Sequence, residues 1–159
     1  MNPTRGAAAK EPRKAAGDIL PEPTAGGGGG EPTTTKLTLV QAVRDAMADE
    51  MAVDDTVLVL GEDVGVDGGV FRATEGLLER FGADRVIDTP LAESGIIGTS
   101  VGLAATGFRP VAEIQFMGFV YPAINQILGH VARMHNRTRG GLGAPMVVRM
   151  PYGGGRPGY

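Results

Sequence analysis

The chain has 159 residues, of which 42% are hydrophobic and 21% are charged, and its formal net charge is -3. Fifteen Lys and Arg against eighteen Asp and Glu, without a long basic run, argue against a nucleic-acid-binding protein. Because the chain has no Cys, it has no disulfide framework, thiolate nucleophile or Cys zinc site. No apolar run approaches the roughly 20 residues of a membrane span. We therefore expect one soluble, cytoplasmic domain.

The first 35 residues differ in composition from the rest of the chain. Residues 1–35 are rich in Pro, Gly, Ala, Thr and charge, and they include "AGGGGG". Such a segment cannot offset its ordering entropy by burial, so we expect a disordered arm. Residues 36–159 then form the folded domain.

Buried strands alternate with helical patterns along this domain. Thr38 and Gln41 form a predicted capping box, and "TVLVLG" is an uninterrupted apolar run typical of a strand covered on both faces. The expected order is a helix from Thr38, a strand over 56–61, a helix over 71–82, a strand over 85–88, a helix ending at Gly107, a strand over 109–116, a helix over 121–137 and a strand over 145–151. This alternation predicts an α/β fold with a doubly wound, mostly parallel sheet.

The helix that ends at Gly107 is built almost wholly of small residues. Thr89 and Pro90 are its expected N-cap and first helical residue. Gly95, Gly98 and Gly102 recur at spacings of three and four residues. Because each interior Gly costs about 0.5–1 kcal/mol relative to Ala, we expect this helix to pack tightly against the sheet or against another subunit.

The helix over 121–137 carries an apolar stripe and two histidines. We expect the stripe to be core rather than a cofactor site; it consists of Tyr121, Ile124, Ile127, Leu128 and Val131. His130 and His135 are five residues apart, whereas metal-binding pairs on a helix prefer four, so we expect them to be solvated or to cap the helix.

Two carboxylates follow predicted strands. Ligands of an open parallel sheet bind at the carboxyl ends of its strands, where Glu62 follows "VLVLG" and Glu93 follows "RVIDTP". From the residues alone, Glu62 can be a solvated loop acid beside Asp63, and Glu93 can simply stabilise a helix N-terminus. The loop "GVDGGVF" lacks both phosphate-binding glycine motifs, which favours a tight turn.

Several motifs, taken in their order along the chain, resemble those of a known protein family. With "LGEDVG", "GGVF", "RVIDTPLAESGIIGTSVGLAATGFRPVAEIQF" and the following "QI", the chain resembles the beta subunit of the thiamine-diphosphate-dependent, decarboxylating first component of 2-oxo acid dehydrogenase complexes. That group comprises the pyruvate and branched-chain 2-oxo acid dehydrogenases. The resemblance runs from about Leu37 through Gly155 and implies the transketolase-like pyrimidine-binding domain.

The resemblance implies a role for four residues. Glu93 matches the family acid that hydrogen-bonds ring nitrogen N1' of thiamine diphosphate, and so makes the exocyclic amine a base towards thiazolium C2. Leu91 matches an aliphatic position against the cofactor, and Phe119 matches an aromatic against its aminopyrimidine ring. Glu62 matches an acid that belongs to an acidic relay near the cofactor.

The resemblance also implies partners. An alpha subunit would hold Mg2+ and the diphosphate in an alpha2beta2 heterotetramer, and the acyl group from a 2-oxo acid would pass to lipoyl-lysine of an acyltransferase component. Relatives continue after "PYGGG" to an active-site histidine, whereas this chain ends in "RPGY", so we expect an incomplete domain. Two alternatives remain: a truncated, non-catalytic module that binds the alpha subunit, and a transketolase-like thiamine-diphosphate enzyme.

Overall fold

The computed structural model describes residues 36–153. The expected disordered arm over residues 1–35 lies outside the described residues, as does the end of the chain from residue 154. Within residues 36–153, no helix is long and apolar enough to cross a membrane.

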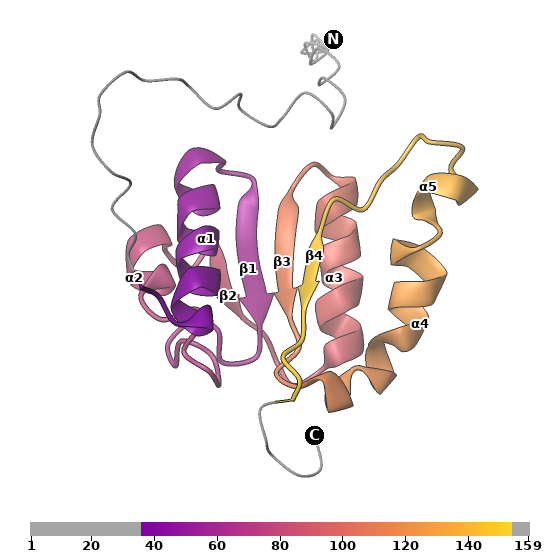
Figure 1. Ribbon diagram of the computed structural model, residues 1–159. Coiled ribbons are helices and arrows are strands. Elements are labelled where there is room, and N and C mark those ends of the chain that lie inside the picture. The colour runs from indigo at the N-terminus through magenta and orange to yellow at the C-terminus, as the bar shows by residue number, and fades with distance from the viewer. Residues whose placement is uncertain (1–35, 154–159) are drawn as a thin grey trace, which may run out of the picture. The chain divides into compact units, whose positions relative to one another are not determined.

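Four parallel strands form one sheet, in the order β2-β1-β3-β4 (Figure 1). The expected α/β fold with a parallel sheet is confirmed. The elements with repetitive helical or strand structure are α1 (Leu39–Val53), β1 (Val57–Gly61), α2 (Leu77–Phe81), β2 (Val86–Asp88), α3 (Glu93–Ala105), β3 (Arg109–Glu113), the 3-10 turns η2 (Met117–Phe119) and η3 (Tyr121–Ala123), α4 (Ile124–Gln126), the π-helical turn η4 (Ile127–Val131), α5 (Met134–Arg137) and β4 (Val147–Arg149).

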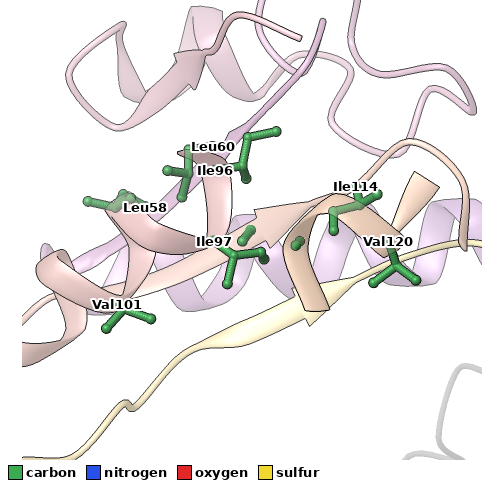
Figure 2. Close-up of a cluster of buried hydrophobic side chains, with 9 residues drawn as sticks. Leu58, Leu60, Ile96, Ile97, Val101, Ile114 and Val120 are labelled. Atoms are coloured by element: carbon green, nitrogen blue, oxygen red, sulfur yellow. The ribbon is translucent and has the colours of Figure 1, made fainter. Parts of the chain in front are cut away.

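The sheet is covered on both faces, which explains why β1 is apolar at every position. Alternate side chains of a strand point to opposite faces. Leu58 and Leu60 join a buried cluster with α3, drawn in Figure 2, whereas Val57 and Val59 join a second cluster with α1 and α2. Figure 1 accordingly shows α1 in front of the sheet and α3 behind it. Two cores therefore hold the sheet from either side.

The start of α1 has the N-terminal cap that the sequence predicts. The Thr38 hydroxyl accepts a hydrogen bond from the backbone N–H of Gln41 at 3.2 Å, and the Gln41 side chain accepts one from the Thr38 N–H at 2.8 Å. The predicted capping box is thus confirmed, and it satisfies N–H groups that a helix start would otherwise leave free.

The helix expected over 71–82 is much shorter than predicted. Only α2, Leu77–Phe81, is helical, because Arg72 and Gly76 have positive φ angles of 59° and 79°, which a right-handed helix excludes. Gly82 ends the helix as expected, with its N–H donating to the Leu78 carbonyl at 2.9 Å.

The start of α3 was predicted three residues too early. Its N-cap is Ala92, and Thr89 does not cap it. Instead, the Thr89 N–H donates to the Gly61 carbonyl at 2.9 Å, which extends the pairing of β2 with β1. Pro90 disfavours the helical conformation of the residue before it, so Thr89 does not join the helix. Glu93 is consequently the first residue of the helix.

The prediction of one regular helix over 121–137 was wrong. The segment passes through η3, α4, η4 and α5, with Pro122 at the start and Gly129 in the π-helical turn. The expected core stripe is wrong in part. Ile127 and Val131 pack against the core, whereas Tyr121, Ile124 and Leu128 are exposed.

Candidate functional site

The carboxyl ends of the strands meet at one edge of the sheet. Gly61 of β1 is in register with Asp88 of β2 and with Glu113 of β3, and Glu113 is in register with Arg149 of β4. The chain crosses from β1 to β2 on one side and then returns to β3 on the other. The switch point therefore lies between β1 and β3, where doubly wound sheets bind their ligands.

Glu62 lies directly at this switch point, and it is buried rather than solvated. Only 6% of its surface is exposed, and its Oε1 has no hydrogen-bond partner among the described residues. Burial raises the pKa of the Glu62 carboxyl, and the negative charges of Glu93 and Asp63 raise it further. The interpretation of Glu62 as a solvated loop acid was therefore wrong.

Glu93 is the second carboxylate of the site. It is the first residue of α3 and is half-buried. Its charge acts on Glu62, so the turn after β2 brings the two predicted acids into one electrostatic environment although they are far apart in the sequence. A pair of interacting carboxylates of this kind can hold and exchange a proton.

The loop that carries Glu62, residues 62–76, is fixed by side chains from both neighbouring strands. The Asp88 carboxylate accepts hydrogen bonds from the N–H groups of Gly65 at 2.6 Å and Val66 at 3.4 Å. Gln115, just after β3, donates to the Asp63 carboxylate at 2.9 Å. These contacts hold the loop across the carboxyl edge of the sheet.

The glycines of this loop make the predicted tight turn. Gly68 and Gly69 have φ angles of 70° and 75°, which L side chains rarely adopt. The Gly69 N–H donates to the Asp63 carbonyl at 2.7 Å, and the Thr74 hydroxyl donates to the Val64 carbonyl at 2.7 Å. The loop is therefore folded back upon itself by its own hydrogen bonds.

A buried ion pair that the sequence analysis missed lies at the same edge. Glu113 is 1% exposed, and its Oε2 accepts a hydrogen bond from the Arg149 guanidinium. The sequence carried a signal for it, because a charged residue interrupts the buried run "VAEIQF". The pair ties β4 to β3 where both strands end.

Aromatic and aliphatic side chains lie in the segments that follow β1, β2 and β3 at this edge of the sheet. Phe119 is 40% exposed and meets Phe116 edge to face, with ring centroids 5.5 Å apart. Phe116 makes a second such contact with Phe71, again at 5.5 Å. Leu91, two residues before Glu93, is 81% exposed. Phe119 and Leu91 are thus exposed and available for apolar contact in the segments that follow the strands at the site edge.

The other candidate positions contribute no metal site. His130 and His135 are both exposed, as expected. Within residues 36–153, no group of three His, Cys, Asp or Glu side chains could hold a metal ion.

The glycines of α3 do not pack against the sheet. Ile96, Ile97, Ser100, Val101 and Ala104 are the buried residues of this helix. A Cβ atom added at Gly102 would meet nothing within 4 Å, and one at Gly95 would meet only Ala92. Packing against the sheet was therefore the wrong explanation of these glycines, and packing against a subunit stays a prediction.

A groove of about 530 Å³ lies on the opposite side of the sheet from α3. It runs between α1 and the strands β3 and β4, and its walls are mainly apolar. None of Glu62, Leu91, Glu93 and Phe119 lines it. The groove is therefore separate from the carboxylate site.

Together, the parallel doubly wound sheet and the two carboxylates at its switch point define an α/β ligand-binding domain. Residues 35–159 match the family described as transketolase, pyrimidine binding domain. The chain belongs to this family.

Similar proteins include dehydrogenase beta subunits. The pyruvate dehydrogenase E1 component subunit beta is 58% identical over 120 residues in Staphylococcus epidermidis and 57% identical over 120 residues in Bacillus subtilis. Each alignment covers 76% of this chain and 37% of the relative. The 3-methyl-2-oxobutanoate dehydrogenase subunit beta of Mycobacterium tuberculosis is 60% identical over 122 residues, 77% of this chain and 35% of its own length. The chain thus spans little more than a third of the length of these curated relatives.

Proposed function

We propose that this chain provides the aminopyrimidine-binding half of a thiamine-diphosphate site, as the beta subunit of a 2-oxo acid dehydrogenase. The observation that carries the proposal is the buried carboxyl of Glu62 at the switch point of a transketolase-type pyrimidine-binding domain, where the charge of Glu93 helps to raise its pKa. The relatives named above favour a pyruvate or a branched-chain 2-oxo acid as the substrate. Their names also favour this assignment over a transketolase-like enzyme.

The described residues fit an aminopyrimidine ring. A ring nitrogen needs a partner that can share a proton, and Glu93 is a half-buried acid at the start of α3 whose charge acts on Glu62. Glu62 has a buried carboxyl oxygen, Oε1, without a partner in residues 36–153, and a bound group or a neighbouring acid would satisfy this polar atom. The exposed faces of Phe119 and Leu91 offer apolar contact to a flat ring.

The chain's own residues would then work as follows. Thiamine diphosphate, when bound, supplies an acidic thiazolium carbon and an electron sink for decarboxylation. Glu93 would hold the proton at ring nitrogen N1'. Glu62, whose pKa is raised by burial and by Glu93, would keep a proton available beside that carboxylate. Phe119 and Leu91 would orient the ring and exclude water from it.

An alpha subunit would supply the rest of the site. Many of the large apolar side chains left exposed lie in the segments that follow the strands at the site edge: Val66, Val70, Phe71, Leu91, Met117, Phe119 and Tyr121. Clustered exposed apolar side chains indicate a surface that another protein covers. In the proposed alpha2beta2 assembly, that partner would hold Mg2+ and the diphosphate, and a lipoyl acyltransferase component would receive the acyl group.

The test uses the native complex that contains this chain. Glu93→Gln keeps the shape of the side chain but removes its proton exchange, and we expect assembly to persist while decarboxylation of pyruvate or of a branched-chain 2-oxo acid falls by roughly 10²- to 10⁴-fold. Glu79→Gln, an exposed acid of α2, is the matched control and should stay active.

Near-normal decarboxylation by the Glu93→Gln complex would refute the role of Glu93. A wild-type complex that binds thiamine diphosphate and an alpha subunit but decarboxylates neither class of substrate would favour the non-catalytic module instead.

A further inference from the structure

We propose that Phe71 and Phe116 are positioning residues that set the orientation of the Phe119 ring against the aminopyrimidine. This inference rests on the proposed function. It concerns an aromatic row defined here as Phe71, Phe116 and Phe119, in which each ring contacts the next.

The geometry of the row carries the inference. Both pairs have ring centroids 5.5 Å apart, and their interplanar angles are 72° for Phe71 with Phe116 and 81° for Phe116 with Phe119. In such edge-to-face contacts, the positive edge of one ring meets the negative face of the next, which makes the attraction depend on orientation. The tilt of one ring therefore constrains the tilt of its neighbour.

The Phe119 ring needs support from other side chains because the backbone segment that carries it does little to fix its orientation. It lies on the short 3-10 turn η2, which has no side-chain cap, and 40% of its surface is exposed. Within η2, no residue is buried. A ring on such a turn would sample several rotamers unless another side chain restricted it.

Phe71, at the far end of the row, lies on a firmly held backbone. Next to it, the Arg72 N–H donates to the Gly69 carbonyl at 3.0 Å, and the Arg72 guanidinium donates to the Asp67 carbonyl at 2.9 Å. The loop itself is anchored to the sheet through Asp88. Phe71 can thus act as the fixed end from which orientation passes through Phe116 to Phe119.

The row also joins the two sides of the switch point. Phe71 belongs to the loop after β1, which carries Glu62, whereas Phe116 and Phe119 follow β3. The same two segments are joined by the hydrogen bond from Gln115 to Asp63. The acid and the aromatic platform of the proposed site are therefore held in one arrangement.

The test is a double-mutant cycle in the native complex, with the dissociation constant for thiamine diphosphate measured by calorimetry in saturating Mg2+. We expect Phe71→Leu to raise this constant roughly two- to tenfold, with kcat at saturating cofactor largely retained. In a Phe119→Leu background, Phe71→Leu should add no further loss, because its effect passes through Phe119.

Two variants separate positioning from general destabilisation. Phe71→Tyr keeps the aromatic ring, so the complex should keep the wild-type affinity for thiamine diphosphate. Phe108→Leu removes a phenylalanine of similar exposure, 39%, at the opposite end of β3 and should leave the affinity unchanged. Phe116→Leu should reproduce the effect of Phe71→Leu, and the melting temperature of the Phe71→Leu complex should stay close to that of wild type.

The outcomes distinguish the two proposals. If the wild-type complex binds thiamine diphosphate but Phe71→Leu leaves the dissociation constant unchanged, the positioning role is overturned and the proposed function stands. If Phe71→Leu has its full effect in the Phe119→Leu background, Phe71 acts independently of Phe119 and the inference is again overturned. A wild-type complex that binds no thiamine diphosphate refutes the proposed function and the inference together.

Discussion

Removal of Arg149 should destabilise the domain far more than removal of an exposed arginine. Glu113 is 1% exposed and is paired with Arg149, whose side chain is 20% exposed. Arg149→Met would leave a buried carboxylate without its counter-charge, and breaking a buried pair in this way costs about 3–5 kcal/mol. Because Arg149 is partly exposed, we expect the lower end, about 3 kcal/mol. That is a large share of the roughly 5–15 kcal/mol by which domains are stable.

The assay is urea unfolding of the full chain, followed by circular dichroism. With a slope of about 1.5 kcal/mol per molar urea, a loss of about 3 kcal/mol lowers the midpoint by about 2 M. Arg109→Met is the matched control on the same sheet. Arg109 pairs with Asp54 at 3.5 Å, but its side chain is 42% exposed, so the change should cost under about 1 kcal/mol.

The double variant Glu113→Leu with Arg149→Met tests the physical reason. It removes both charges, and replacement of a whole buried pair by apolar residues is often neutral or stabilising. We therefore expect the double variant to be more stable than Arg149→Met alone. Equal costs for Arg149→Met and Arg109→Met would refute the reasoning, and so would a double variant no more stable than Arg149→Met.

Two further predictions concern the core and the pH dependence of stability. Ile97→Ala, at a fully buried position of α3, should cost about 2–5 kcal/mol, whereas Leu91→Ala, at an 81% exposed position, should stay within about 0.5 kcal/mol; similar urea midpoints would contradict this. Because burial, Glu93 and Asp63 raise the pKa of Glu62, the stability from its protonated form is complete below the ordinary value of 4.5 and is lost as the pH rises through the raised pKa. Glu62→Gln should lessen this decline in urea titrations carried upward from the ordinary pKa of 4.5, and an unchanged slope would argue against it.

The sheet could be predicted because its central strand β1 is buried on both faces. An uninterrupted run such as residues 57–61 has few alternatives to a central parallel strand, and the acids that follow two such runs then meet at one edge. The positions of Glu62 and Glu93 at the carboxyl edge of the sheet could therefore be predicted from the sequence. The burial of Glu62 could not be predicted, because it depends on how the loop over residues 62–76 folds back. A short glycine-containing stretch does not specify that fold.

The remaining features depend on contacts between distant segments. Arg149 is 36 positions from Glu113, and Phe71 is 45 positions from Phe116. Local patterns therefore identify neither partner, although the charged residue in "VAEIQF" does mark Glu113 as unusual. Thr89 failed as a helix cap for a related reason. Its side chain is of a type that caps helices, but its N–H extends the pairing of β2 with β1 by donating to Gly61.

The two buried cores and the predicted carboxylates of the edge are supplied by different residues. Buried aliphatic side chains on the two faces of the sheet form the cores, and Glu62 and Glu93 belong to neither cluster. The edge residues are instead held by hydrogen bonds and ring contacts, such as Asp88 of β2 with Gly65 and Phe71 with Phe116. Substitutions at exposed loop positions such as Phe71 can therefore change the proposed cofactor binding with little effect on folding, whereas Val64 of the same loop belongs to a buried core cluster. For the same reason, the double-mutant cycle on the aromatic row can report on orientation of the ring rather than on loss of the fold.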